Sequence, residues 1–121
     1  MKYFFSLEIL ANSEQADKIT NILGIKPNYP QVAWGYKLIV KDHAYTNFID
    51  YFINILENKY DKLHDIGIER ENISIWMIYE YKEQCNMEFS PSDMKKLGDS
   101  GITFCISCYE NSSSKSPTTE R

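Results

Sequence analysis

Glycine is scarce in this sequence, with five residues among 121. Loops that cradle phosphate groups need closely spaced glycines, as in the G-x-x-x-x-G-K-[ST] and G-x-G-x-x-G motifs, and neither motif occurs here. The G-x-S-x-G sequence of serine hydrolases is also missing. These absences weaken the case for an enzyme. A glycosidase-like carboxylate pair stays open, because spacing along the chain does not fix such a pair.

Long apolar runs are also missing. No stretch of about 20 apolar residues exists, so the sequence predicts no membrane-spanning helix. Near the N-terminus, Ser6 and Glu8 interrupt the apolar run before it reaches the roughly 7–15 residues of a signal peptide. Three cysteines without such a signal do not indicate a disulfide framework. We therefore expect a cytoplasmic protein.

Basic residues are outnumbered, and the net charge is −4. Residues 42–110 carry thirteen carboxylates against six Lys and Arg, a balance of −7. Direct nucleic-acid binding needs clustered Lys and Arg, so it is not predicted. An acidic body suits a basic partner, because complementary charge speeds encounter. The alternative is a charge that only keeps the protein soluble.

Apolar residues alternate with polar ones in four segments, as they do in half-buried strands. These segments are 2–10, 32–40, 72–81 and 102–110. Helical spacing appears at about 13–23, at 49–63 with a break near Asn58, and at 91–98. The order β-α-β-α-β-α-β predicts an α+β two-layer sandwich, with helices on one face of a four-stranded, mainly antiparallel sheet. We expect one domain over 1–110 and a disordered tail over 111–121, which has no apolar residue. The strand order is not determined.

Several residues mark where the elements begin and end. Asn12 has the capping-box pattern of a helix start, and Gly24 is placed to end that helix in a left-handed conformation. Ser90 is the predicted N-cap of the third helix, and Gly98 its predicted end. Gly35, inside a strand, indicates a bulge or a close backbone approach.

The sheet face turned away from the helices is unusually apolar. We assume that Phe104, Ile106 and the residues of the other strands that share their face lie under the helices. The face away from the helices then carries aromatic rings beside carboxylates: Phe4, Glu8, Trp76, Glu80 and Tyr109. Trp and Tyr ringed by charges are typical interface anchors. Alternatively, the loop around Tyr29 or the tail covers these rings, or sheet curvature buries them. For a partner-binding surface we expect this face, Tyr29, or the acidic helix residues Asp50, Glu57 and Asp61.

The sequence offers one metal-like grouping, Asp61, His64 and Asp65, on one helical face. One imidazole with two carboxylates is a small ligand set, and a solvated acidic helix end explains it as well. We therefore expect a protein that is not an enzyme and binds no cofactor. Metal-dependent activity at this grouping is the alternative. Cys105 and Cys108 are three apart in a strand, so they should point to opposite faces and share neither a metal nor a disulfide.

Three stretches resemble a bacterial family of domains of unknown function: LGIKP at 23–27, DKLHDIGI at 61–68 and FSPSDMKKLGDSGITFCISCYE at 89–110. The resemblance covers about residues 2–110. It implies a small cytoplasmic domain without established catalytic residues, some of whose relatives look like immunity proteins encoded beside secreted toxins. The segment between Pro27 and Trp34 is shorter than the loop this family often has.

The leading interpretation is a cytoplasmic immunity protein that binds and occludes a bacterial toxin domain, with a basic nuclease as one candidate. A small-ligand-binding or regulatory domain, with a pocket near Tyr29, Trp34 and Tyr36, is the alternative. A homodimer joined through the aromatic sheet face is a third possibility, so both monomer and homodimer stay open.

Overall fold

The computed structural model describes residues 3–39, 47–84 and 86–110, so the predicted tail over 111–121 lies outside the described residues. In this part of the chain the elements follow in order: β1 (Tyr3–Ile9), α1 (Ser13–Leu23), β2 (Trp34–Ile39), α2 (Phe48–Leu56), α3 (Tyr60–Asp65), the 3-10 helix η1 (Arg70–Asn72), β3 (Ile73–Tyr81), α4 (Pro91–Ser100) and β4 (Thr103–Glu110). Within the same ranges, no helix has the length and apolar character needed to cross a bilayer.

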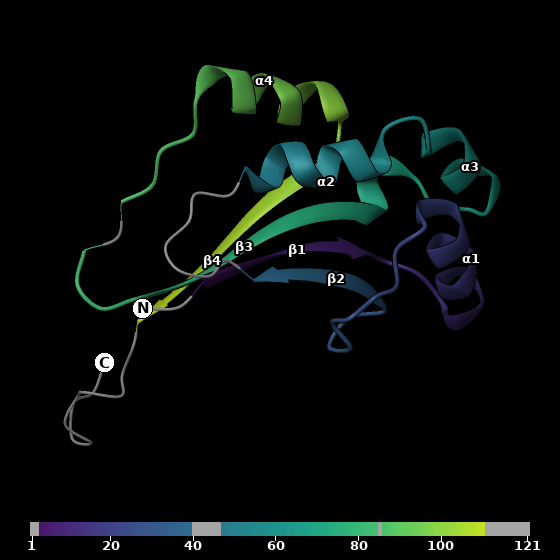
Figure 1. Ribbon diagram of the computed structural model, residues 1–121, viewed down its shortest axis with the longest axis horizontal. Coiled ribbons are helices and arrows are strands. Elements are labelled where there is room, and N and C mark those ends of the chain that lie inside the picture. Colours follow the sequence, from purple (N-terminus) through teal and green to yellow (C-terminus); the bar gives the residue numbers. More distant parts are fainter. Residues whose placement is uncertain (1–2, 40–46, 85, 111–121) are drawn as a thin grey trace.

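The sheet has the strand order β2-β1-β3-β4. β1 pairs antiparallel with both β2 and β3, and β4 pairs parallel with β3. Figure 1 shows α2 and α4 on one side of the sheet, while α1 and α3 lie at the end of the sheet toward which β1 runs. The predicted α+β class and the mainly antiparallel sheet are confirmed. The parallel β3–β4 pair follows from the connection through α4, because parallel neighbours need a crossover.

The core lies between the sheet and α2. Phe5 and Leu7 of β1 are buried on this face, and the Phe5 ring stacks on Phe48 with centroids 4.0 Å apart. Trp34 is fully buried, and its indole Nε1 donates a 3.0 Å hydrogen bond to Thr20 Oγ1 on α1. The alternation read from the strands therefore separates a buried helix side from an opposite face, as expected.

The predicted helix boundaries are largely confirmed. Asn12 and Gln15 form the reciprocal capping box, with hydrogen bonds of 2.7 and 3.0 Å, and Gly24 ends α1 at φ +72°. Asn58 has φ +66° and separates α2 from α3, which is the break predicted there. A non-glycine residue at positive φ is uncommon, and Asn is one of the few types that adopts it readily.

Two predictions about the last helix and the last strand are wrong. α4 does not end at Gly98 but continues to Ser100, and Gly101 at φ +72° is the left-handed cap. The last turn is held by the Lys95–Asp99 ion pair and by Ser100 Oγ, which donates to the Leu97 carbonyl. Ile106 is 43% exposed rather than covered by the helices. Because β4 is an edge strand, Ile106 has a neighbouring strand on one side only.

Candidate protein-binding surface

The sheet side away from α2 and α4, called the open face, carries the predicted anchors. Strand register places alternate residues there: Phe4, Ser6, Glu8, Ser74, Trp76, Ile78, Glu80, Cys105 and Tyr109. Tyr109 is 49% exposed, and Trp76 and Ile78 are half-buried. The described residues therefore leave the rings of Trp76 and Tyr109 partly accessible.

Tyr29 covers one of the predicted anchors. Its ring packs edge-on against Phe4 with centroids 5.8 Å apart, and Lys37 Nζ lies 4.3 Å from the Phe4 centroid. The Tyr29 loop is fixed to β2, because the amides of Asn28 and Tyr29 both donate to the Gly35 carbonyl oxygen. A Cβ on Gly35 would lie 3.1 Å from Tyr29 Cβ, which confirms the predicted close approach. Phe4 and Tyr29 thus contact each other, and the alternative of a covering loop holds for Phe4.

Trp76 is held in place on the open face. Its indole Nε1 donates a 2.8 Å hydrogen bond to Ser74 Oγ. Beside it, Ser6 is fully buried in the register position between Lys37 and Trp76. Ser6 Oγ donates a 2.8 Å hydrogen bond to Glu8 Oε2. The side chains of Trp76 and Glu8 are therefore oriented before any partner arrives.

Trp76 forms one wall of a hollow of about 220 Å³ at the end of the open face, called the Trp76 hollow. Apolar side chains form most of the wall, including Leu10, which is 70% exposed, and Val32. Two carboxylates, Glu8 and Glu71, line the same hollow. This combination suits the apolar stem and cationic head of a lysine or arginine side chain.

Two further hollows extend the series that begins with the Trp76 hollow, because each shares lining residues with the one before it. Glu71 also lines a hollow of about 640 Å³ between α3 and η1. Tyr60 and Arg70 line that second hollow and also a third, of about 510 Å³, between α2 and α4. Successive hollows therefore lie next to one another, and we call the three together the strip.

Carboxylates outnumber basic side chains in this strip, and we call them the acidic rim: Glu8, Asp50, Glu57, Asp61, Glu69, Glu71 and Asp99. Three of them are in ion pairs, Asp50 with Lys96, Glu69 with His64 and Asp99 with Lys95. Among the described residues the other four, Glu8, Glu57, Asp61 and Glu71, take part in no ion pair. The strip therefore has an excess of negative charge.

Tyr60 and Arg70 occupy the middle of the strip. The Arg70 guanidinium carbon lies 3.6 Å from the Tyr60 ring centroid, and Nη1 donates to the Ser100 carbonyl oxygen. The Tyr60 hydroxyl is shielded from solvent and has no hydrogen-bond partner among the described residues. Burial raises the pKa of Tyr60, and the nearby positive charge of Arg70 opposes that rise. Arg70 joins η1 to the end of α4 at the middle of the strip.

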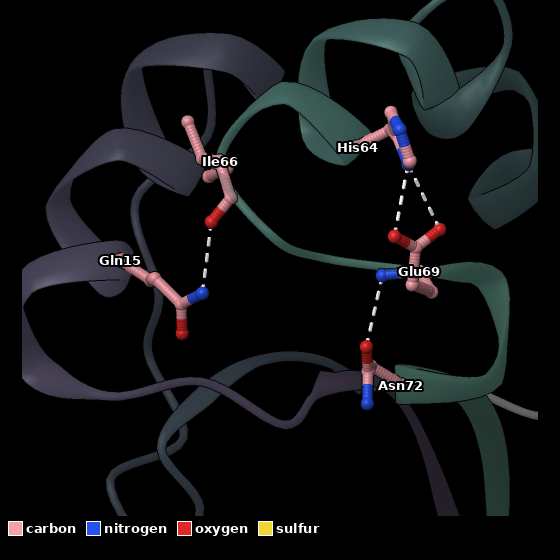
Figure 2. A network of polar contacts seen from close by, with 5 residues as sticks. All are labelled: Gln15, His64, Ile66, Glu69 and Asn72. Atoms are coloured by element: carbon pink, nitrogen blue, oxygen red, sulfur yellow. Dashed lines mark hydrogen bonds and ion pairs between the residues drawn. The ribbon is translucent and has the colours of Figure 1, made fainter.

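His64 pairs with a carboxylate that the sequence did not suggest. Its Nδ1 lies 2.9 Å from Glu69 Oε2, and the Glu69 amide donates to Asn72 Oδ1 (Figure 2). The hydrogen bond to Glu69 and its negative charge raise the pKa of His64. Within the described ranges no group of three or more His, Cys, Asp or Glu side chains is placed to hold a metal ion. The grouping of Asp61, His64 and Asp65 therefore gains no geometric support.

The two strand cysteines lie on opposite faces, as predicted. Cys105 is in register with Trp76 on the open face, and Cys108 is in register with Tyr79 on the helix side. Burial, and then the negative charge of Glu8, raises the pKa of the Cys105 thiol. A raised thiol pKa reduces the fraction of the reactive thiolate near neutral pH.

In the part of the chain that the structure describes, Tyr29, Trp34 and Tyr36 do not face a common pocket, contrary to the expectation from the sequence. Trp34 is fully buried in the core, whereas Tyr29 lies on the open face against Phe4. Strand alternation separates them, because Trp34 pairs with Ile9 on the helix side of the sheet. The backbone of β2 therefore stands between the two rings.

The structure places the nine predicted site residues in three groups. Phe4 and Tyr29 form the covered pair, Glu80 and Tyr109 are register neighbours on the open face, and the other five line the strip: Glu8, Asp50, Glu57, Asp61 and Trp76. The sequence reasoning missed Tyr60, Arg70 and Glu71, which join the hollows. No local pattern marks these residues, because their contacts are made across distant segments.

Comparison of the chain with protein-family models, with curated proteins and with solved structures finds no match in any of the three. The resemblance of 23–27, 61–68 and 89–110 to a bacterial domain family therefore stays a prediction.

Proposed function

We propose that this protein is an immunity protein, which binds a basic toxin domain through the strip of hollows and inactivates it by occlusion. The observation that carries the proposal is a set of four rim carboxylates that line adjacent hollows and form no ion pair with any residue that the structure describes: Glu8, Glu57, Asp61 and Glu71. Carboxylates outside ion pairs can each accept a cationic side chain of a partner. A nuclease domain, which carries positive charge to bind phosphates, presents such side chains.

The Trp76 hollow supplies the anchor for this contact. A lysine or arginine stem can lie against Leu10 and Val32 while its head reaches Glu8 or Glu71. A cation close to an indole face gains about 0.5–2 kcal/mol, depending on how far it is desolvated. The binding residues need little ordering, because Trp76 is already hydrogen-bonded to Ser74, which lowers the cost of association.

Occlusion requires no reaction at the surface. The rim would meet the positive groups that a nuclease uses for its own substrate, and complementary charge would speed encounter. The resemblance to immunity-protein-like domains points in the same direction, and so does the lack of phosphate-binding and serine-hydrolase motifs.

The test is co-expression with the C-terminal domain encoded by the neighbouring reading frame. We expect a stable complex and relief of that domain's toxicity. The double substitution Glu57→Lys and Glu71→Lys should abolish both effects, since it reverses charge in all three hollows. The matched control is Glu14→Lys with Asp17→Lys, which makes the same change of charge on exposed positions of α1.

Three outcomes would contradict the proposal. No complex and no relief of toxicity would remove the immunity function. Equal loss from the α1 control would show that net charge, rather than the rim, is responsible. Unchanged protection by the rim variant would place the contact elsewhere on the molecule.

A second candidate function, small-ligand binding, is favoured by a separate hollow of about 280 Å³ under the beginnings of α2 and α4. Aromatic rings and methionines line it, including Phe48, Met77 and Phe89, with Asp93 as a polar group. Its volume is close to the lower end of the roughly 300–1,000 Å³ typical of ligand pockets. Fluorescence enhancement of 8-anilinonaphthalene-1-sulfonate by the folded protein, lost in Met77→Glu, would support this candidate.

A further inference from the structure

The two edges of the sheet are treated differently. On the outer edge of β2, the Asn28 side chain binds the backbone of Lys37 through both of its polar atoms. Its Oδ1 accepts from the Lys37 amide at 2.6 Å, and its Nδ2 donates to the Lys37 carbonyl oxygen at 3.2 Å. The amides of Asn28 and Tyr29 bind the Gly35 carbonyl oxygen. The loop thus occupies the edge positions that another strand would need.

Among the residues that the structure describes, none covers the outer edge of β4 between Thr103 and Ser107 in a comparable way. Between Thr103 and Ser107, no backbone hydrogen bond from the described residues reaches this edge, and β3 is the one strand that pairs with β4 there. Natural proteins protect such edges with charged residues, proline or bulges. The stretch 103–109, TFCISCY, contains neither a charged residue nor proline, and its parallel register with β3 runs without a bulge.

We propose that β4 pairs antiparallel with β4 of a second copy of this chain, on a two-fold axis through Cys105. The two four-stranded sheets then form one continuous eight-stranded sheet. A two-fold contact requires that the same patch be complementary to itself. Residues 103–107 of β4 meet this requirement, because each of them lies opposite a residue of similar character in the second copy.

In the proposed register Phe104 lies opposite Ile106 of the second copy, and this pair occurs twice. Aromatic and β-branched residues are favourable cross-strand partners. On the open face Thr103 lies opposite Ser107 of the second copy, a pair that can hydrogen-bond. The two Cys105 residues meet at the axis. No charged side chain lies in this stretch, so the pairing places no like charges directly opposite each other.

The exposure of Ile106 also fits this pairing. It is 43% exposed in the middle of the strand, on the helix side of the sheet. A second copy would supply the missing neighbouring strand and place Phe104 beside it. The homodimer that the sequence left open as a third possibility is joined through the aromatic sheet face, which is a different surface. The edge contact leaves Trp76 and the acidic rim on each copy available for a partner, so it is independent of the proposed function.

The first test measures mass against concentration by sedimentation equilibrium. A short edge contact buries less than the roughly 1,200–2,000 Å² of a standard interface, so we expect dimers at high micromolar rather than nanomolar concentration. The mass should rise from 14.2 kDa toward twice that value. Ile106→Lys should weaken dimerisation on the order of tenfold or more, because it replaces two favourable cross-strand pairs by buried charges. Met94→Lys, at a 56% exposed position of α4, is the control and should leave dimerisation unchanged.

The second test uses the cysteines and leaves the apolar edge residues unchanged. In Cys85→Ser with Cys108→Ser, Cys105 is the one remaining thiol, and residues opposed in an antiparallel pair have Cα atoms about 4.5–5.5 Å apart, within disulfide range. Diamide, which accepts the two electrons and two protons of the thiols, should give a covalent dimer. In Cys85→Ser with Cys105→Ser, the two Cys108 residues would be roughly 20 Å apart in the same register and should not cross-link.

A monomer at all concentrations would overturn the proposal. A dimer that Ile106→Lys leaves intact would show that the contact lies elsewhere. A dimer sensitive to Ile106→Lys that cross-links through Cys108 and not through Cys105 would overturn the proposed register.

Discussion

The Arg70 guanidinium carbon lies 3.6 Å from the centre of the Tyr60 ring, so the two side chains stack at the middle of the acidic rim. The same guanidinium donates a hydrogen bond to the Ser100 carbonyl oxygen, thirty residues along the chain. One side chain therefore joins η1, α3 and the end of α4. The contact fixes the relative position of the second and third hollows, because Tyr60 and Arg70 line both.

Replacing Arg70 by alanine should lower the free energy of unfolding by about 1–2 kcal/mol. The loss combines a cation–π contact with a hydrogen bond to a charged donor, and partial exposure of the side chain reduces both. Urea denaturation followed by circular dichroism measures the change. Arg70→Lys is the control, since it keeps the charge but not the planar stacking. If the lysine variant is as stable as the native protein, stacking contributes nothing.

Tyr60→Phe should leave the free energy of unfolding unchanged or raise it, in contrast to Arg70→Ala. The hydroxyl of Tyr60 is shielded from solvent and has no partner among the described residues, while its ring carries the contact with Arg70. Removing an unpaired buried hydroxyl removes a desolvation cost of about 1–3 kcal/mol. The same urea experiment should show a protein at least as stable as the native one. A clear loss of stability would mean that the hydroxyl has a partner.

The His64–Glu69 pair predicts a pH dependence with a defined sign. Glu69 raises the pKa of His64 above its ordinary value of about 6.5, so the protonated ring is favoured in the folded state. The stabilisation is therefore fully present below about pH 6.5 and is lost as pH rises through the raised folded pKa. Glu69→Gln should lower the pKa of His64, measured by NMR titration of the ring Cε1–H signal.

The side-chain amide that Glu69→Gln introduces can still accept the backbone hydrogen bond of the η1 cap, so this variant isolates the charge. The stability difference between the native protein and Glu69→Gln should shrink at alkaline pH. A difference that stays constant from pH 5 to pH 9 would contradict a role for the ion pair.

Much of the fold could be predicted because its signals are local. The Asn12 cap, the Gly24 cap and the break at Asn58 each depend on a few neighbouring residues, and all three are found. Gly98 was misread because two glycines lie close together, and the choice of Gly101 depends on the bonds made by Ser100. Strand order could not be read, since alternation gives the two faces of a strand but not its neighbours.

The candidate site was predictable only in part for the same reason. Trp76 and Glu8 were singled out because an exposed aromatic ring beside a carboxylate is visible in the alternation. Glu71 lies in η1, and it joins Glu8 and Leu10 in the wall of the Trp76 hollow only because the end of η1 lies beside the end of β1. The backbone bond from the Leu10 amide to the Asn72 carbonyl holds that arrangement, and it joins residues 62 positions apart. No local pattern encodes such a contact.

The close packing at Gly35 gives a prediction about the open face. An alanine Cβ there would lie 2.5 Å from Val32 Cγ2 and 3.1 Å from Tyr29 Cβ, so the loop must move. Gly35→Ala should cost about 1–3 kcal/mol, the usual range for overpacking. It should also separate Tyr29 from Phe4, detectable as lost nuclear Overhauser contacts between the two rings. A stable variant with these contacts intact would show that the loop yields without uncovering Phe4.

The two tryptophans differ enough to report separately on the core and on the Trp76 hollow. Trp34 has no exposed surface, whereas Trp76 is half-buried on the open face. In Trp34→Phe the remaining emission comes from Trp76, and acrylamide should quench it readily. In Trp76→Phe the emission comes from Trp34 and should resist quenching.

Adding hexa-arginine should change the Trp76 emission, because the arginine side chains match the hollow between Glu8 and Glu71. The Trp34 emission should stay unchanged. If Glu71→Gln abolishes the response while Glu14→Gln on α1 does not, the cation binds at the Trp76 hollow. If Glu71→Gln and Glu14→Gln weaken the response equally, the peptide is held by net charge alone.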